Sequence, residues 1–292
     1  MELQGKVALV TGASRGVGAA VAVALGEAGC AVACAARSTA DQPQRTPGTL
    51  DRTLELVRAA GGDAIAIPTN LAKEDEVVAM VRRAEEVYGR VDILINNAAI
   101  TFVGDLDIPL HRHDLIMEVN LRAPLIATRT VMPGMRARRI GSIVNVSSVA
   151  ALYPHPSLMS YGISKVGLER LTIDVAKQVQ EYGIAVNCFR IDIPVASEGF
   201  VANTPGTDRA NWEPSSVAAE GILWMLQQPA SYSGRRESMF GLRQREGIMR
   251  SQAQHPYTDA PPTELFSGLA EFASSNFVEP YPDSAATGEV QS

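Results

Sequence analysis

The chain has 292 residues, of which 46% are hydrophobic and 20% are charged, and its net charge at pH 7 is −6. This composition is ordinary for a soluble globular protein, and the length suffices for one large α/β domain. The negative charge disfavours nucleic-acid binding, because phosphate contacts need clustered Lys and Arg side chains. No apolar stretch reaches the roughly 18 residues that a membrane-spanning helix needs, so we expect no membrane contact.

The cysteines and histidines give no sign of disulfides or of a metal site. Cys30, Cys34 and Cys188 are odd in number and form no C-x-x-C pair, which predicts buried, reduced thiols. The first residues lack the basic and apolar pattern of a secretory signal, so we expect a cytoplasmic protein. The four histidines show no metal-ligand spacing, and His111 and His113 are interpreted as the start of a helix.

Short apolar runs alternate along the chain with segments of helical period. Strands are predicted at 7–10, 31–35, 64–67, 93–95, 142–146 and 185–189, and helices at 16–28, 50–60, 74–88, 113–136 and 161–182. Continuous apolar strands that alternate with helices indicate right-handed βαβ crossovers and a parallel sheet covered on both faces. The predicted fold class is therefore α/β, a doubly wound Rossmann fold.

Three stretches interrupt this alternation. Residues 38–49 are rich in turn-forming residues and predict a surface loop, and residues 194–214 predict a mobile lid. The pattern fades from about residue 241, and residues 279–292 form a polar tail. We expect one domain over residues 1–240, followed by a partly flexible C-terminal extension over residues 241–292.

A glycine-rich turn joins the first predicted strand to the first helix. Its glycines allow a tight turn, and the N-terminus of the following helix offers unpaired N–H groups to a pyrophosphate. The turn could also be no more than a compact strand–helix connection. The residues predicted to contact phosphate are Gly12, Ser14, Arg15, Gly16, Val17 and Gly18.

The end of the second strand bears on the choice of cofactor. An acidic residue there would bind the ribose hydroxyls of NAD, but the sequence has Arg37 followed by Ser38. Arg37, together with Arg15 from the glycine turn, could bind a 2′-phosphate through charge-assisted hydrogen bonds. These residues favour NADP over NAD; the alternative is that both arginines are ordinary surface cations.

Tyr161 and Lys165 are four residues apart on a predicted helix and therefore share one face. A nearby ammonium group, together with an oxidised nicotinamide ring, would lower the pKa of the phenol and suit it to acid–base chemistry. Such a pair is common by chance and needs further support. Ser148, near the carboxyl end of a central strand, could hold a substrate oxygen. Asn120 lies in an apolar helical segment, where it could support a helix distortion or a water relay to Lys165.

These motifs together resemble the short-chain dehydrogenase/reductase family over roughly residues 5–240. The resemblance is carried by the turn from Thr11 to Gly18, Asn96-Asn97-Ala98-Ala99, Asn120, Ser148, and Tyr161 with Lys165. It implies the strand order 3-2-1-4-5-6-7 and a catalytic tetrad of Asn120, Ser148, Tyr161 and Lys165. Ser148 is preferred to Ser147 because the family places this serine thirteen residues before the tyrosine. Further cofactor contacts are expected from Ser38, Asn70, Leu71, Asn97, Ala98, Ala99, Tyr161, Lys165 and Ile193.

The sequence departs from the family pattern at several positions. Asn70 stands for the usual adenine-contacting aspartate, and Ala99 for the usual glycine. Ile191-Asp192 replaces a Pro-Gly pair that normally lies beside the nicotinamide. Our hypothesis is that Asp192 pairs with Arg190 or another cation and shapes that end of the pocket; a solvated loop carboxylate is the alternative.

The resemblance implies an NADPH-dependent carbonyl reductase or alcohol dehydrogenase, working as a homotetramer or homodimer through its two long helices. A non-catalytic NADP-binding regulator or scaffold of the same fold is the alternative, and the tail could recruit a protein partner. The substrate is a small carbonyl or alcohol compound. An apolar or ring-bearing one would suit the residues expected near the pocket, which are Tyr153, Pro154, His155, Met159, Phe200 and Trp212.

Overall fold

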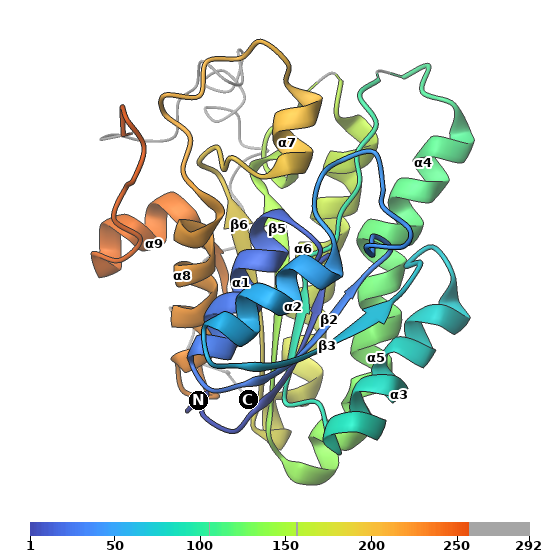
Figure 1. Ribbon diagram of the computed structural model, residues 1–292, viewed down its shortest axis with the longest axis vertical. Coiled ribbons are helices and arrows are strands. Elements are labelled where there is room, and N and C mark those ends of the chain that lie inside the picture. The colour runs from blue at the N-terminus through green and yellow to red at the C-terminus, as the bar shows by residue number, and fades with distance from the viewer. Residues whose placement is uncertain (105, 156, 257–292) are drawn as a thin grey trace, which may run out of the picture.

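The computed structural model of the chain describes residues 1–104, 106–155 and 157–256. Its centre is a parallel sheet in the order β3-β2-β1-β4-β5-β6-β7 (Figure 1), which confirms the predicted doubly wound fold. The strands are β1 (Val7–Thr11), β2 (Ala31–Ala36), β3 (Asp63–Pro68), β4 (Ile93–Asn96), β5 (Gly141–Ser148), β6 (Ile184–Ile191) and β7 (Arg236–Ser238).

Helices cover both faces of the sheet, and each layer buries its own apolar core. One core includes side chains of α1, α2, α8 and α9, and the other includes side chains of α3, α5 and α6. The helices are α1 (Gly16–Glu27), α2 (Leu50–Ala59), α3 (Glu74–Tyr88), α4 (Leu110–Met117), α5 (Ala123–Arg138), α6 (Met159–Val179), α7 (Glu198–Asn203), α8 (Ser215–Gln227) and α9 (Met239–Glu246). Because helices lie on both sides, the central strands are buried along their whole length, as in β1 and β4.

The predicted helix over residues 113–136 is two helices joined by a wide turn. After α4 the chain forms a π-helical turn, Glu118–Arg122, and then continues as α5. Pro124 has no N–H to donate to the carbonyl four residues earlier, which is that of Asn120, so a regular α-turn is disfavoured here. The prediction of one continuous helix is therefore wrong, and the distortion falls at the asparagine.

The folded domain continues past residue 240. The strand β7 and the helix α9 were not located from the sequence, and the expected boundary falls inside α9. Met239, Leu242 and Met249 are fully buried in the core on this face. The expected tail at residues 279–292 lies outside the described residues.

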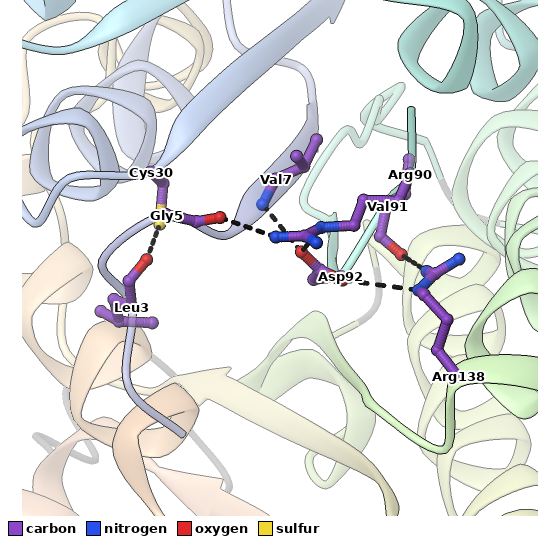
Figure 2. A network of polar contacts seen from close by, with 8 residues as sticks. All are labelled: Leu3, Gly5, Val7, Cys30, Arg90, Val91, Asp92 and Arg138. Carbon is purple, nitrogen blue, oxygen red and sulfur yellow. Dashed lines mark hydrogen bonds and ion pairs between the residues drawn. The ribbon is translucent and has the colours of Figure 1, made fainter. Parts of the chain in front are cut away.

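At the amino end of the sheet, the buried carboxylate of Asp92 holds three segments together (Figure 2). It accepts a hydrogen bond from Val7 N at 3.1 Å and from Arg90 Nε at 2.8 Å. The Nε atom of Arg138, at the end of α5, lies 3.7 Å from the second carboxylate oxygen. Arg90 also donates to the Gly5 carbonyl. Asp92 therefore joins the start of β1, the start of β4 and the end of α5.

Candidate functional site

The predicted site residues gather at the carboxyl edge of the sheet, the upper edge in Figure 1. The strands β1, β4, β5 and β6 end there, and the chain leaves them toward α1, α4, α6 and α7 respectively. The strand order reverses between β1 and β4, since β2 and β3 continue on one side of β1 and β5 to β7 continue on the other side of β4. Ligands of doubly wound folds bind outside the carboxyl edge at such a reversal.

The glycine turn after β1 is compact because two of its residues adopt left-handed backbone conformations. Gly12 has φ of +69° and Gly16 has φ of +57°, which side chains rarely tolerate. A Cβ atom on Gly12 would lie 2.8 Å from the Asn97 side-chain amide, and one on Gly18 would collide with that same amide. The N-cap residue of α1, Arg15, makes no capping hydrogen bond with its side chain, so it leaves the first N–H groups of the helix uncapped. This cradle fits a pyrophosphate group.

Asn97 holds the turn from the neighbouring strand. Its side-chain amide donates to the Thr11 carbonyl at 2.9 Å, and its backbone N–H donates to the Thr11 hydroxyl at 3.1 Å. The next residue, Ala98, also donates to that hydroxyl and lies against Gly12. Asn97 therefore stabilises the turn through hydrogen bonds to Thr11. Ala99 is exposed at the carboxyl edge of the sheet.

The loop after β2 is joined to the glycine turn by Arg15. The Arg15 guanidinium donates to the carbonyls of Pro47 and Gly48 at 2.7 and 3.0 Å, and the Ser38 hydroxyl donates to Gly48 at 2.7 Å. Arg37 is exposed and close enough to help lower the pKa of Arg15, although burial is the larger cause. The two predicted 2′-phosphate ligands thus lie near each other, with Arg15 fixed by the loop.

The adenine-side residues lie in a turn after β3. Asn70 Oδ1 accepts a hydrogen bond from Ala72 N at 3.1 Å, and Asn70 N donates to the Glu76 carboxylate at 2.7 Å. Leu71 is partly exposed beside it. The Asn70 oxygen is therefore used to shape the turn.

Tyr161, Lys165 and Ser148 come together as the sequence predicts. The Tyr161 and Ser148 hydroxyls are hydrogen-bonded, and Lys165 Nζ lies 5.5 Å from the centre of the Tyr161 ring. The lysine is buried, and its ammonium donates to the Val146 carbonyl at 2.8 Å. Three groups capable of hydrogen bonding or proton transfer thus lie where β5 meets α6.

The pKa of the phenol runs opposite to the expectation. Burial raises the pKa of Tyr161 to about 12, and the hydrogen bond from Ser148 opposes this only in part. Burial also lowers the pKa of Lys165 to about 8, although Cys188 and Glu169 favour its charged form. The expected lowering by the lysine is not found, because burial has the largest influence on the pKa of Tyr161 and Ser148 is what opposes it.

Asn120 lies in the π-helical turn with its side chain fully buried. Its amide oxygen accepts from Ile100 N at 2.8 Å, and its amide nitrogen donates to the Ile100 carbonyl at 2.9 Å and to Ser164 at 3.1 Å. Of the two roles left open from the sequence, support of a helix distortion is the one with contacts here. The asparagine ties this distortion to the segment after β4 and to α6.

Asp192 forms no direct ion pair with Arg190 among the described residues, although burial, which raises the pKa of Asp192, is opposed in part by the Arg190 charge. Asp192 is buried and accepts a hydrogen bond from Phe240 N at 2.9 Å, at the start of α9. The Arg190 guanidinium instead donates two hydrogen bonds to the Glu169 carboxylate. Nε lies 2.9 Å from Oε1, and Nη2 lies 2.6 Å from Oε2. Burial also excludes the alternative of a solvated carboxylate. Ile193 is buried just beyond this point.

The segment 194–214 has a fixed base. Glu213 N donates to Pro194 O at 2.9 Å, and the fully buried Glu213 carboxylate accepts from Arg243 at 2.8 Å and Ser251 at 2.6 Å. The Phe200 and Trp212 rings stack with their centres 4.6 Å apart. The residues expected near a substrate, Tyr153, Pro154, His155 and Met159, keep exposed surface before and at the start of α6.

Sequence reasoning missed the contact between this segment and the glycine turn. A Cβ atom on Gly16 would lie 2.9 Å from Ser197 Cβ and 3.5 Å from a Glu198 carboxylate oxygen. Ser197 caps α7 through the backbone N–H of Phe200. A serine followed by an acidic residue is a helix-capping pattern that could have located the start of α7, but nothing local to the sequence indicates its contact with Gly16.

Residues 1–104, 106–155 and 157–256 hold neither a metal-binding cluster nor a membrane-spanning helix. These ranges contain no cluster of three His, Cys, Asp or Glu side chains that could hold a metal ion. They also contain no helix long and apolar enough to cross a lipid bilayer.

The fold and the arrangement at its carboxyl edge are those of a dinucleotide-binding oxidoreductase, and comparison with known proteins narrows this class. The short chain dehydrogenase family model matches residues 6–193. A short chain dehydrogenase of Pseudocercospora fijiensis is 37% identical over 63% of this chain and 58% of its own length. Dehydrogenase/reductase SDR family member 4 of Bos taurus is 37% identical over 64% of each chain, so our chain spans less than two thirds of these two relatives.

A 3-oxoacyl-[acyl-carrier-protein] reductase of Synechocystis is 35% identical over 73% of this chain and 80% of its own. Among solved structures, a metagenomic short-chain oxidoreductase in complex with NADP superposes with a TM-score of 0.68 at 29% identity, covering 82% of this chain and 99% of that one. The chain belongs to the short-chain dehydrogenase/reductase family, whose members are oxidoreductases that use nicotinamide cofactors.

Proposed function

We propose that this protein transfers a hydride between NADP(H) and a carbonyl compound or secondary alcohol, with Tyr161 as the proton donor or acceptor. The observation that carries the proposal is the hydrogen-bonded pair of Tyr161 and Ser148 hydroxyls at the end of β5, with Lys165 one helical turn away. The chemistry supplied by the bound nicotinamide is the gain or loss of the hydride itself.

The protein side of the reaction rests on these three residues. The Ser148 and Tyr161 hydroxyls together can hold a carbonyl oxygen between them. Because burial keeps the pKa of Tyr161 near 12, the phenol is protonated at neutral pH and can give its proton to the oxygen as that oxygen gains negative charge. The Lys165 ammonium then stabilises the phenolate that remains. Asn120 maintains the distorted turn against which α6 packs.

NADP is favoured over NAD by the two neighbouring cations at the end of β2. Arg37 is exposed and Arg15 is oriented by its hydrogen bonds to the loop carbonyls, so both can face a 2′-phosphate. The Ser38 hydroxyl donates to the Gly48 carbonyl, so Ser38 would contact the 2′-phosphate through its backbone. The NADP complex of the metagenomic relative agrees with this choice.

We also propose that the protein is a cytoplasmic homodimer or homotetramer. Ile163 and Val166 on α6 and Leu125 on α5 are exposed apolar side chains, at fractions of 46%, 51% and 38%. These are the two long helices that the sequence favours as an interface. Covering these side chains in a second copy would remove them from water.

The experiment that tests the proposed reaction is NADPH oxidation with a panel of ketones and aldehydes, compared between the wild type and Tyr161→Phe. We expect turnover to fall by a factor of about 10² to 10⁴ while NADPH binding persists, because the phenol acts on the substrate oxygen. Equal turnover in both proteins would overturn the role of Tyr161.

A non-catalytic NADP-binding protein of the same fold is the second candidate. It is favoured by Asp192, which stands where the family usually has a glycine beside the nicotinamide. The Asp192 carboxylate accepts a hydrogen bond from Phe240 N in α9. This candidate predicts tight NADPH binding in the wild type with no consumption of NADPH against any carbonyl.

A further inference from the structure

The face of α6 that carries Tyr161 and Lys165 has a third polar member. Residues four apart on this helix each contact one of the last three residues of β5. The contacts are Tyr161 with Ser148 through their hydroxyls, Lys165 with the Val146 carbonyl at 2.8 Å, and Glu169 with the Ser147 hydroxyl at 2.7 Å. Glu169 therefore continues the same row of contacts one helical turn below the lysine.

Glu169 is held in a buried ion pair. The residues Glu169 and Arg190 are 4% and 7% exposed, and the guanidinium binds the carboxylate through two hydrogen bonds, at 2.9 and 2.6 Å. Arg190 and Ser147 are directly paired across β5 and β6, so both reach the same carboxylate oxygen. The Arg236 guanidinium lies 3.9 Å from the other oxygen. The carboxylate is thus hydrogen-bonded from β5 and β6, and β7 adds a third charged contact.

The Lys165 ammonium has no water-filled surroundings to stabilise its charge, because the residue is only 2% exposed. The charge state of the lysine then depends on nearby groups. The titratable and charged groups around it and its carboxylate neighbour come from α6, β6 and β7, and they are Tyr161, Glu169, Cys188, Arg190 and Arg236. Burial raises the pKa of the Cys188 thiol, which leaves it neutral at pH 7. Glu169 is therefore the carboxylate of this group that favours the charged lysine.

We propose that Glu169 and Arg190 are positioning residues that set the charge of Lys165. The Glu169 carboxylate favours the ammonium form of the lysine, and Arg190 limits this effect by neutralising part of the carboxylate charge. A pair of apolar side chains of similar volume would pack the same space without the desolvation cost of two buried charges. Packing alone therefore does not account for an ion pair at this place.

The test is a direct titration of Lys165 in the full-length protein without any substrate. The chain contains only four lysines, Lys6, Lys73, Lys165 and Lys177, so their side-chain NMR signals can be assigned with a Lys165→Met variant. We expect the Lys165 midpoint to fall by about one pH unit or more in Glu169→Gln, since removal of the carboxylate disfavours the ammonium. In Arg190→Met we expect it to rise, because less of the Glu169 carboxylate charge is then neutralised by a bound cation.

Two controls separate this effect from a general loss of structure. Asp174→Asn removes a carboxylate from the exposed side of the same helix, where Asp174 pairs with Arg170, and should leave the midpoint unchanged. Glu169→Asp keeps the charge and should restore most of the wild-type value. If a single variant does not fold, the double variant Glu169→Gln/Arg190→Met removes both charges and should still lower the midpoint. An unchanged midpoint in the variants of Glu169 that lack its charge overturns the proposal.

The consequence for catalysis rests on the proposed function. In an active enzyme, the alkaline limb of kcat/KM should move to lower pH in Glu169→Gln, in parallel with the Lys165 midpoint. The two ideas fail separately. Equal activity of Tyr161→Phe and the wild type would remove the reaction while leaving the titration result intact, and an unmoved midpoint would remove the charge-setting pair while leaving the reaction intact.

Discussion

The two ends of the sheet each bury a carboxylate against arginines, but the arginines at the two ends differ in their exposure to water. This difference distinguishes a structural contact from the charge-setting pair proposed above. At the amino end, Asp92 is bound by Arg90 and Arg138, whose side chains are 42% and 31% exposed and so remain in contact with water (Figure 2). In the carboxyl half, Glu169 is bound by Arg190, which is itself buried. An ion pair screened by water acts over a short range, whereas a dry one influences the charge of its neighbours.

The surroundings of the two carboxylates decide what each can do. The Asp92 carboxylate binds a backbone N–H and two arginines, and these arginines also donate to backbone carbonyls. Asp92 therefore stabilises the ends of the strands. Glu169 lies one turn from a buried lysine that faces a tyrosine. Variants at the two ends should therefore divide stability from chemistry.

The largest expected effect is at the carboxyl end, in Lys165→Met. We expect turnover to fall by a factor of about 10² to 10⁴, because the phenolate loses its cation. The melting temperature should stay the same or rise at pH 7, since a desolvated ammonium is removed while one hydrogen bond to Val146 is lost.

The stability gain from Lys165→Met should depend on pH with a definite sign. The pKa of Lys165 is lowered in the folded state from 10.5 to about 8, so burial of the ammonium costs stability in full below pH 8. This cost fades as the pH rises toward 10.5, and the gain should fade with it. Melting temperatures of both proteins between pH 6 and about 10 measure this, and a gain that grows with pH would contradict it.

The next effect is at the amino end, in Asp92→Ala. This change leaves the Val7 N–H without its acceptor and two arginines without their carboxylate, and we expect a loss of about 2 kcal/mol in the free energy of unfolding. The pH dependence of kcat/KM should not move. Urea denaturation measures the loss of stability, and the pH dependence of kcat/KM is compared with that of Glu169→Gln, which should shift. An equal shift in both variants would show that the two carboxylates do not differ in their effect on the chemistry.

A smaller effect is expected in the glycine turn. An alanine at Gly18 would collide with the Asn97 amide and the Gly12 carbonyl, so the turn must open, at a cost of about 1–3 kcal/mol. We expect NADPH affinity to fall by about tenfold or more in a fluorescence titration. Gly199→Ala is the matched control, because nothing lies within 4 Å of its added Cβ.

The smallest effect compares two exposed or half-exposed arginines. Arg37→Ala should weaken NADPH binding by about tenfold with little change for NADH, because a charge-assisted contact to the 2′-phosphate is lost. Arg90→Ala, at the amino end, should lower stability slightly and leave both affinities unchanged. Equal losses for NADPH and NADH in Arg37→Ala would argue for a role outside cofactor choice.

The sequence determined the α/β class and most element bounds, because apolar runs and helical periods are local properties of the chain. The strand order followed from the motifs that resemble a known family and not from these local patterns. The helix α3 has the predicted bounds, and the pairing of Tyr161 with Lys165 on one face follows from their spacing alone. Short or weakly patterned elements, such as β7 and α9, were not located from the sequence because their few residues give no clear period.

Only the tertiary structure decided the electrostatics. Spacing placed an ammonium near a phenol, but the direction of both pKa shifts came from burial by segments distant in sequence. The partner of Arg190 was likewise set by the approach of α6 to β6, which brought Glu169 rather than Asp192 within reach. Charge interactions depend on distance and on exclusion of water, and both are properties of the packed molecule rather than of the order of its residues.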